Sequence, residues 1–248
     1  RPPRSTLFPY TTLFRSAELK EILGTSESTI RRDIIALDKE GRLTKVFGGA
    51  IALHQAQIVN KELSMVQKQE LQTMEKQTIA KYAASLIEPD DCVYLDAGTT
   101  TGWMIEYIRE EKATYVTNAL SHAKRLADKG FCVILIGGEP KSSTDAIVGA
   151  EAVLNLQKYH FSKGFFGVNG VDRMSGFTTP DAKEAMVKQV AVKNTQSAHR
   201  YFLTTSAKFG EVYAVTFAGF EGGVILTEDN VSEALPKSIA VVNVNEQN

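Results

Sequence analysis

Hydrophobic and polar residues follow two different periods along the chain, and the change of period divides it into two parts. In the N-terminal part, Ile30, Ile34 and Leu37 lie at positions i, i+4 and i+7 of one segment. This spacing gives a helix one apolar face that can pack on a small core. After residue 75, short apolar runs alternate with helical segments, which is typical of an α/β domain with a largely parallel sheet. We therefore predict a small helical domain followed by a larger α/β domain.

The larger part should contain five helices and eight strands. The expected helices are residues 75–87, 102–108, 120–129, 151–159 and 181–194. The expected strands are residues 92–96, 114–117, 131–136, 164–168, 201–205, 213–217, 224–226 and 239–244. Residues 54–74 have no clear period in their first half and are polar in their second half, so we assign them to a linker.

The N-terminal pattern has the layout of a winged helix-turn-helix. Residues 17–23 predict a short helix, Gly24 and Thr25 a tight turn, and Ser26 the N-cap of a second helix that ends near Gly41. The following residues alternate like a small β-wing. Hydroxyls and arginine side chains near a helix N-terminus suit phosphate oxygens and guanine edges. The expected DNA contacts are Ser26, Ser28, Thr29, Arg31, Arg32 and Lys45.

A solvated amphipathic helix with surface arginines would explain the second helix alone, but it would not explain the turn and the hairpin around it. Residues 26–34 (SESTIRRDI) and 43–50 (LTKVFGGA) together resemble the DNA-binding domain of DeoR-family bacterial transcriptional repressors. The resemblance covers residues 17–51 and implies operator DNA as a partner. We place this winged helix-turn-helix domain at residues 17–53.

The first sixteen residues break the pattern. Residues 6–16 (TLFPYTTLFRS) have no helical period and resemble a translated sequencing adapter. A helix-turn-helix usually has another helix here, which covers the apolar face of the other two. We therefore predict that residues 1–16 are an in-frame artefact and that the winged helix-turn-helix is incomplete, with its first helix missing. A genuine disordered arm is the other interpretation.

Composition narrows the class of protein. The 248 residues carry a net charge of -1, so DNA affinity must come from a few placed cations and from doubling of the module in a homo-oligomer. Cys92 and Cys132 each lie in an apolar run, which predicts small buried, reduced thiols. The four histidines lack metal-ligand spacing, so we expect no metal and no cofactor. No membrane span or secretory signal is evident, and a cytoplasmic protein is expected.

A phosphate-binding turn is predicted between residues 93 and 102 (VYLDAGTTTG). A strand leads into a turn rich in glycine and threonine and then into a helix, which places backbone amides, hydroxyls and the positive end of the helix dipole together. Ligands of open α/β sheets bind at such strand ends. The stretch lacks both the P-loop ending and the G-x-G-x-x-G spacing. A plain strand-to-helix turn is the alternative.

Other candidates lie at further strand and loop ends. Asp181, Glu184 and Lys188 have the spacing of one helix face. Its carboxylates could accept sugar hydroxyls, or they could serve as a cap and a surface ion pair. Lys208 could pair with a phosphate or be an ordinary surface lysine.

These stretches together resemble the C-terminal sensor domain of the DeoR family, which shares its layered fold with ribose-5-phosphate isomerase. The motifs DAGTT, VTN, IGGE, IVGAE, GFFGVNG and GFTTPD occur in family order over residues 75–229, and we place the domain at residues 75–248. Within the family the chain is most similar to repressors of fructose operons.

The resemblance implies a phosphorylated sugar effector, such as fructose 1-phosphate. The residues expected to bind it are Asp96, Gly98, Thr99, Thr100, Asn118, Gly137, Gly138, Asp181, Glu184, Lys188 and Lys208. The sequence departs from the family at Thr205, where the family usually has an aspartate. Such an aspartate could orient the lysine or a sugar hydroxyl.

We therefore expect a sugar-responsive repressor without enzymatic activity, in which the effector favours one of two DNA-binding states. One alternative is a sugar-phosphate isomerase, with Asp181 or Glu184 as the general base and Lys188 or Lys208 as its electrostatic partner. Another is a phosphosugar-binding module that has lost DNA binding. The direction of the effector's influence on DNA binding stays open.

Overall fold

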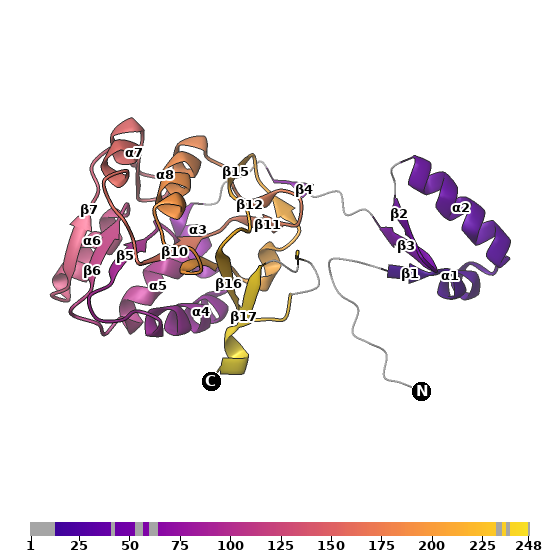
Figure 1. The fold of residues 1–248 in the computed structure, drawn as a ribbon, viewed down its shortest axis with the longest axis horizontal. Helices are drawn as coiled ribbons and strands as arrows, with labels where there is room; N and C mark the ends of the chain where they lie inside the picture. Colours follow the sequence, from indigo (N-terminus) through magenta and orange to yellow (C-terminus); the bar gives the residue numbers. More distant parts are fainter. Residues whose placement is uncertain are drawn as a thin grey trace. The chain divides into compact units, whose positions relative to one another are not determined.

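The computed structural model describes residues 13–40, 43–52, 57–59, 64–231, 235–236 and 239–247. The chain forms two units that divide between Ala56 and Gln57 (Figure 1). The fold class is confirmed: an N-terminal helix-turn-helix unit precedes an α/β unit built on a parallel sheet.

Two helices of the N-terminal unit form the predicted helix-turn-helix. Helix α1 (Ser16–Leu23) ends at Gly24, whose φ of 60° lies in the left-handed region that glycine adopts without strain. Helix α2 (Glu27–Lys39) begins after Ser26, and the Ser26 hydroxyl oxygen accepts a hydrogen bond from the Thr29 amide at 3.2 Å. The predicted N-cap is therefore present, whereas the predicted end of the helix at Gly41 lies outside the described residues.

A three-stranded antiparallel sheet completes this unit. Strands β2 (Leu43–Val46) and β3 (Gly49–Ala52) form the predicted wing, and β1 (Leu13–Arg15) pairs with the other side of β3. The last residues of the segment assigned to an artefact thus have a structural role here. The origin of residues 1–16 stays a prediction.

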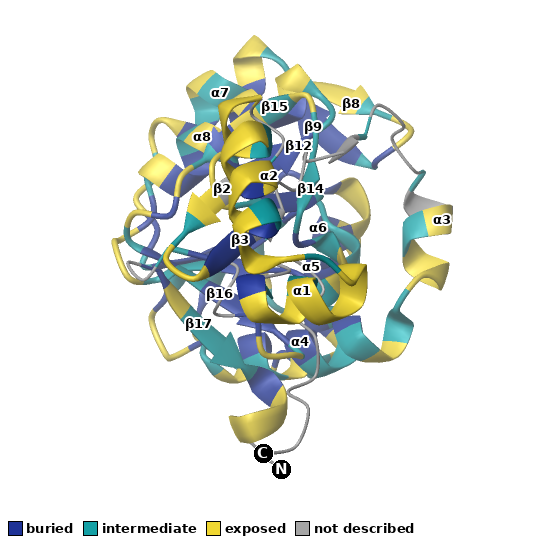
Figure 2. Cartoon of the chain, turned by 90° about the vertical axis from the view of Figure 1, so that its right-hand side faces the viewer, coloured by how far each residue is buried: buried dark blue, intermediate teal, exposed yellow. Residues whose placement is uncertain are grey.

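The small unit has a thin core. One side of α2 is exposed and only a few positions on its inner side are buried (Figure 2). Ile30 is 2% exposed and Ile34 is 5% exposed, as the helical spacing predicts. The core cluster consists of Ile30, Ile34 and Ala50, with Leu19 and Leu43 packed against it.

The C-terminal unit is organised around a seven-stranded sheet in which every pairing is parallel. In spatial order its strands are β17 (Ala240–Asn243), β16 (Gly223–Thr227), β13 (Arg200–Leu203), β10 (Lys163–Gly167), β5 (Cys92–Leu95), β6 (Thr114–Thr117) and β7 (Cys132–Leu135). The predicted α/β arrangement is confirmed, and the central strands β5 and β10 bring their carboxyl ends together.

Helices cover both faces of the sheet (Figure 1). They are α4 (Thr73–Ser85), α5 (Thr99–Tyr107), α6 (Leu120–Asp128), α7 (Ala150–Leu156) and α8 (Ala182–Lys193). Helix α5 contacts both α4 and α6, while α7 contacts α8. Since parallel crossovers are right-handed, the strand order places α5 and α6 on one face and α7 and α8 on the other.

The central strands are buried on both faces, as expected of a covered parallel sheet. Val93 and Leu95 of β5 join the cluster beneath α4 and α5, together with Phe165 of β10. Tyr94 lies between them in sequence and contacts Phe166, with ring centroids 5.6 Å apart. The continuous apolar runs in the sequence therefore reflect two packed faces.

Several short strands were missed by the sequence prediction. The predicted loop before α8 contains β12 (Gly176–Thr179), which lies between β11 (Gly170–Asp172) and β15 (Val215–Ala218) in an antiparallel sheet. Strands β8 (Glu139–Lys141) and β9 (Ala146–Val148) form a hairpin. All four residues of β12 are buried, so it shows no polar–apolar alternation that would reveal a strand.

The predicted linker also contributes structure to the C-terminal unit. Strand β4 (Gln57–Ile58) pairs in parallel with β14 (Glu211–Val212), and α3 (Met65–Glu70) precedes α4. The unit therefore begins near Gln57, whereas the sequence placed the start of the sensor domain at residue 75. The difference arises because β4 is two residues long and is defined by a pairing far along the chain.

The expectation of two buried thiols needs correction. Cys92 is partly buried, but Cys132 is exposed, because β7 is an edge strand with its first and last residues open to solvent. No helix among the described residues could cross a membrane. The same residues contain no group of three His, Cys, Asp or Glu side chains that could hold a metal ion.

Candidate functional site

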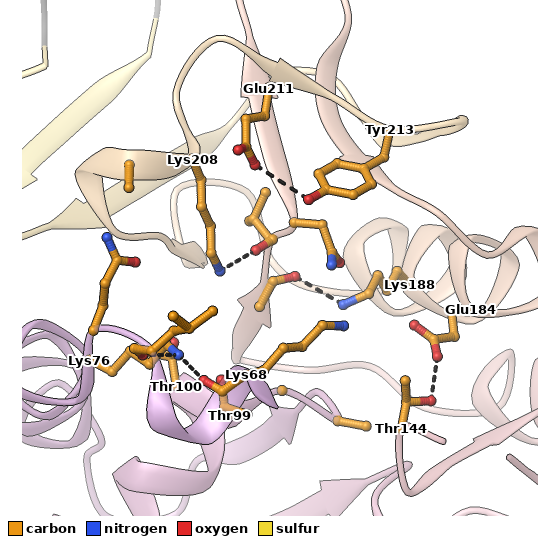
Figure 3. Close-up of a pocket in the computed structure, with 18 residues that line it drawn as sticks. Lys68, Lys76, Thr99, Thr100, Thr144, Glu184, Lys188, Lys208, Glu211 and Tyr213 are labelled. Atoms are coloured by element: carbon orange, nitrogen blue, oxygen red, sulfur yellow. Dashed lines mark hydrogen bonds between the residues drawn. The ribbon is translucent and has the colours of Figure 1, made fainter. Parts of the chain in front are cut away.

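A cavity of about 330 Å³ lies where the sequence predicted a phosphate-binding turn (Figure 3). Its walls come from the carboxyl ends of β5 and β10, the N-terminus of α5, helix α8 and the segment around Lys208. A further wall comes from α3 and the first turn of α4. The volume suits a small polar ligand.

The turn between β5 and α5 forms the floor of the cavity. Gly98, Thr99 and Thr100 line it, and α5 begins at Thr99, three residues before the predicted start. The Thr101 hydroxyl donates to the Asp96 carbonyl at 2.6 Å, and its oxygen accepts from the Gly98 amide at 3.0 Å. These bonds fix the turn, so the free amides and dipole of α5 are available to an anion.

Two backbone segments come into van der Waals contact at Gly98. A Cβ at Gly98 would lie 3.1 Å from the Thr101 hydroxyl oxygen and 3.5 Å from the Gly167 Cα. The short distance to Gly167 brings the ends of β5 and β10 together. A Cβ at position 98 would require a small shift of the Thr101 hydroxyl.

Asp96 and Lys188 form a buried ion pair at the base of the cavity. Asp96 is 1% exposed and Lys188 is 5% exposed. The Lys188 ammonium contacts the Asp96 carboxylate and donates to the Gly167 carbonyl at 2.9 Å, while the Gly167 amide donates to Asp96 at 3.0 Å. Asp96 does not line the cavity; it holds Lys188, which does. Full pairing satisfies both buried charges.

Glu184 is the principal carboxylate of the α8 wall. It accepts from the Thr144 hydroxyl at 2.5 Å and from the Lys141 ammonium at 3.0 Å. Asp181 caps α8 by accepting from the Glu184 amide at 2.9 Å, and Lys141 also bridges to it at 3.0 Å. Burial opposes ionisation, but these bonds lower the pKa of Asp181. Asp181 therefore caps α8 and does not line the cavity, whereas Glu184 does.

Four lysines line the cavity: Lys68, Lys76, Lys188 and Lys208 (Figure 3). The Lys208 ammonium donates to the Val168 carbonyl at 2.5 Å. Burial, followed by the nearby lysines, lowers the pKa of Lys208 to about 7. Burial and the neighbouring Lys68 also lower the pKa of Lys76. Within the described residues, neither Lys76 nor Lys208 forms an ion pair with a carboxylate. An anion in the cavity would relieve this repulsion.

Lys68 and Lys76 were missed by the sequence analysis. Lys68 lies in the segment assigned to the linker and Lys76 near the start of the predicted helix 75–87, and neither belongs to a glycine-rich turn or follows a predicted strand. Only the packing of α3 against the cavity reveals their position.

Besides Asp96 and Asp181, three more predicted effector residues lie outside the cavity lining. The Asn118 side-chain oxygen accepts from the Tyr94 hydroxyl and the Ala97 amide, both at 3.0 Å, so Asn118 supports the β5–α5 turn from below. Gly137 and Gly138 are exposed. A Cβ at Gly138 would lie 2.7 Å from the Val148 carbonyl oxygen, so this glycine permits the β8–β9 hairpin to pack closely.

Thr205, the departure from the family pattern, is also outside the lining. It is fully buried and its hydroxyl donates to the Gln72 side-chain oxygen at 2.7 Å. Thr205 therefore does not contact the cavity itself but holds a residue that lines it.

The predicted DNA contacts gather on the first turns of α2 and on the wing. The Ser26 hydroxyl is 2.8 Å from that of Ser28 and 2.9 Å from that of Thr29. Arg31 pairs with Glu27 at 2.7 Å, and both side chains are more than half exposed.

Arg32 is exposed and has no hydrogen bond or ion pair with another described residue. On the wing, the Lys45 amide donates to the Asp38 carboxylate at 2.8 Å, which ties β2 to α2. The Lys45 residue is exposed. The arrangement thus offers hydroxyls and cations to a nucleic-acid surface.

Comparison with known proteins agrees with both halves of this description. Residues 14–56 match the DeoR-like helix-turn-helix domain, and residues 71–230 match the DeoR C terminal sensor domain. Among solved structures, ribose 5-phosphate isomerase A from Methanocaldococcus jannaschii is 15% identical, with a TM-score of 0.39 over 54% of this chain and 53% of that one.

Curated relatives extend the similarity across both units. An uncharacterized HTH-type transcriptional regulator, FruR of Bacillus subtilis (strain 168), is 42% identical over 213 residues, covering 86% of this chain and 83% of the relative. The lactose phosphotransferase system repressor of Staphylococcus aureus (strain NCTC 8325 / PS 47) is 40% identical over 200 residues, covering 79% and 78%. The chain therefore belongs to the DeoR family of DNA-binding transcriptional regulators.

Proposed function

We propose that this chain represses a sugar-utilisation operon and that a phosphorylated sugar in the 330 Å³ cavity controls its binding to operator DNA. The observation that carries the proposal is the pairing of a helix N-terminus with Lys76 and Lys208, two lysines that lack a carboxylate partner among the described residues. This combination favours a dianionic phosphate over a neutral sugar.

The lining offers two kinds of group to a ligand. Thr99, Thr100 and Lys208 offer donors to a phosphate. Glu184 and Asn169 line the cavity as well, and their side-chain oxygens can accept sugar hydroxyls. The ligand is thus held as a phosphosugar rather than as inorganic phosphate alone.

Fructose 1-phosphate is our first candidate, because the chain resembles repressors of fructose operons and is 42% identical to FruR of Bacillus subtilis. The lactose phosphotransferase system repressors make other phosphorylated sugars the second group to test. We place the protein in the cytoplasm, where phosphorylated sugars are formed.

On the DNA side, Arg31 and Arg32 would reach base edges or phosphates, and Lys45 would hold the wing to the backbone. One module offers few cations, and the whole chain has a net charge of -1. We therefore propose a homo-oligomer that presents paired modules to operator half-sites.

An isomerase is the second class to test, since a phosphosugar cavity could also support catalysis. Its candidate base Glu184 already accepts bonds from Thr144 and Lys141, and the relatives named above are regulators. We expect no interconversion of sugar phosphates when they are incubated with the protein and followed by NMR. Turnover would support the enzyme instead.

Operator binding tests the regulatory proposal directly. The full chain, and a version in which the Bacillus subtilis relative's N-terminus replaces residues 1–16, are titrated onto labelled promoter DNA of the operon and followed by fluorescence anisotropy. We expect the replaced version to bind this DNA more tightly than an unrelated sequence, with an affinity that changes when fructose 1-phosphate is added. Equal binding to both DNAs would contradict the proposal. Binding by the replaced version alone would support the interpretation of residues 1–16 as an artefact.

A further inference from the structure

Residues 64–76, which we call the strap, form one wall of the cavity although they lie outside the sheet. The strap contains α3, the connection at Leu71 and Gln72, and the first turn of α4. Gln72 has a φ of 50°, a left-handed conformation that is unusual for a residue with a Cβ. In chain order the strap lies between the DNA-binding unit and the first strand of the sheet.

Lys76 holds the strap through hydrogen bonds to two of its backbone carbonyls. Its side chain is 3% exposed, and its ammonium donates to the Lys68 carbonyl and, at 2.6 Å, to the Leu71 carbonyl. These carbonyls lie at the carboxyl end of α3 and in the connection that follows, where no helical amide can satisfy them. An ammonium group has three donors, so one remains, and Lys76 lines the cavity (Figure 3).

A second hydrogen bond joins the strap to the segment that follows β13. The Gln72 side-chain oxygen accepts from the Thr205 hydroxyl at 2.7 Å, and Thr205 is the last residue before the short 3₁₀-helix (Ser206–Lys208) that carries Lys208. Gln72 and Lys208 both line the cavity. A hydrogen bond therefore joins the strap to the turn that carries Lys208, and both segments line the cavity.

We propose that Lys76 couples occupancy of the cavity to the order of the strap. This inference rests on the proposed function. An anion in the cavity accepts the third N–H of Lys76 and stabilises its charged form, which burial and Lys68 disfavour in the empty cavity. The same ammonium bonds the Lys68 and Leu71 carbonyls, so an anion that fixes the Lys76 nitrogen also restrains these two strap carbonyls.

The physical consequence is a strap that tightens when the ligand binds. A ligand can shift an equilibrium only by its differential affinity for the two states, and here the contact with Lys76 provides that difference. In the sequence the strap lies between the DNA-binding unit and the first strand of the sheet. Lys76 is thus both an anion-binding residue and the residue that holds the strap.

Hydrogen–deuterium exchange of the full chain tests this coupling. The probes are fructose 1-phosphate and inorganic phosphate, and the two regions compared are residues 64–76 and residues 97–107 at the N-terminus of α5. We expect either anion that protects residues 97–107 to slow exchange in residues 64–76 as well.

Substitutions separate binding from coupling. Lys76→Met should abolish the slowing in the strap and weaken anion binding about tenfold, the loss expected for one hydrogen bond to a charged group. Thr205→Val changes a residue outside the cavity lining and removes its hydrogen bond to Gln72. This substitution should raise strap exchange in the absence of anion. Lys81→Met removes an exposed charge from the same helix, and it should leave strap exchange and anion binding as in the unsubstituted chain.

The outcomes distinguish this inference from the function on which it rests. Protection of residues 97–107 without any change in the strap would overturn the coupling and leave the effector cavity intact. Protection of neither region by fructose 1-phosphate, inorganic phosphate or other sugar phosphates would overturn both. Strap protection that survives in Lys76→Met would show that another group carries the coupling, and it would also overturn our assignment of Lys76.

Discussion

The two units of this protein present positive charge in opposite ways. On the DNA-binding unit, the Arg31 side chain is 71% exposed, and its ion pair among the described residues is with Glu27, whose side chain is 53% exposed. In the sensor cavity, Lys76 is 3% exposed and Lys188 is 5% exposed. Exposed charges are screened by salt, so several of them must act together. A buried charge needs a partner of opposite charge, and it therefore favours ligands that provide one. The comparison indicates that the DNA face is adaptable and that the cavity is specific.

The hydrophobic cores of the two units also differ in size. The DNA-binding unit packs α2 on a cluster of a few aliphatic residues, while the sensor unit buries aromatic and aliphatic side chains on both faces of a seven-stranded sheet. A small core leaves little stability to lose. The sensor unit can therefore hold strained or repelling groups that the smaller unit could not.

The largest expected effect is on the stability of the sensor unit. Phe165→Ala removes a fully buried ring from the centre of the sheet and should lower the free energy of unfolding of that unit by about 3–5 kcal/mol. Denaturant unfolding followed by circular dichroism measures the loss. The matched control Met174→Ala changes a side chain that is 91% exposed, and its effect should stay within about 0.5 kcal/mol. Equal losses for the two variants would contradict the assigned core.

Lys208→Met should weaken effector binding by about 1.5–3 kcal/mol, because it removes a charged donor from the cavity. Isothermal titration with fructose 1-phosphate gives the affinity. DNA binding without effector should be unchanged, which separates the two units. An unaltered effector affinity would place the phosphate elsewhere in the cavity.

Arg32→Ala should weaken operator binding by about 1–3 kcal/mol and reduce discrimination between DNA sequences. Arg31→Ala should cost less, since Arg31 must first leave Glu27 in order to reach DNA. Anisotropy titrations at several salt concentrations compare the two. The reverse order would show that the Glu27 pair orients Arg31 for DNA.

The smallest effect is a dependence on pH. Burial and nearby lysines lower the pKa of Lys208 to about 7, so its charge is present below that pH and is lost above it. Phosphosugar affinity should therefore fall between pH 6 and pH 8 by more in the unsubstituted chain than in Lys208→Arg, which stays charged. Identical pH profiles would exclude Lys208 as the titrating group.

The same shift has a consequence for folding. The unfolded chain keeps an ordinary lysine with a pKa near 10.5, so between pH 7 and that value the unfolded state binds more protons than the folded state. The contribution of Lys208 to the free energy of unfolding therefore rises with pH across this window, and it is unfavourable below pH 7.

The sequence predicted the elements and motifs better than it predicted the site. Ile30 and Ile34 revealed the buried face of α2 because helical spacing is local. Gly98 to Thr100 could be found because a turn after an apolar strand is also local. Lys76 could not be found, since its role depends on one carbonyl of α3, on the Leu71 carbonyl that follows α3, and on a cavity formed by distant strands.

Two other predicted site residues have contacts that the sequence did not indicate. Asn118 has the motif of a ligand-binding residue, yet the structure uses its side chain to support the β5–α5 turn. Asp96 was expected to meet the effector, and it instead holds Lys188 beneath the cavity. In both cases the residue type was informative, but its partner was decided by packing between segments far apart in the sequence.

The central claim is that the sensor cavity binds a phosphorylated sugar, and thermal unfolding tests it without involving the DNA-binding unit. The full chain is heated with a panel of sugar phosphates led by fructose 1-phosphate, with inorganic phosphate and unphosphorylated fructose as controls. A ligand at 100 times its Kd should stabilise the folded protein by about 2.7 kcal/mol, a shift in Tm of a few degrees. We predict such a shift with one phosphosugar and a smaller one, or none, with the controls. The absence of a shift with every sugar phosphate would contradict the account.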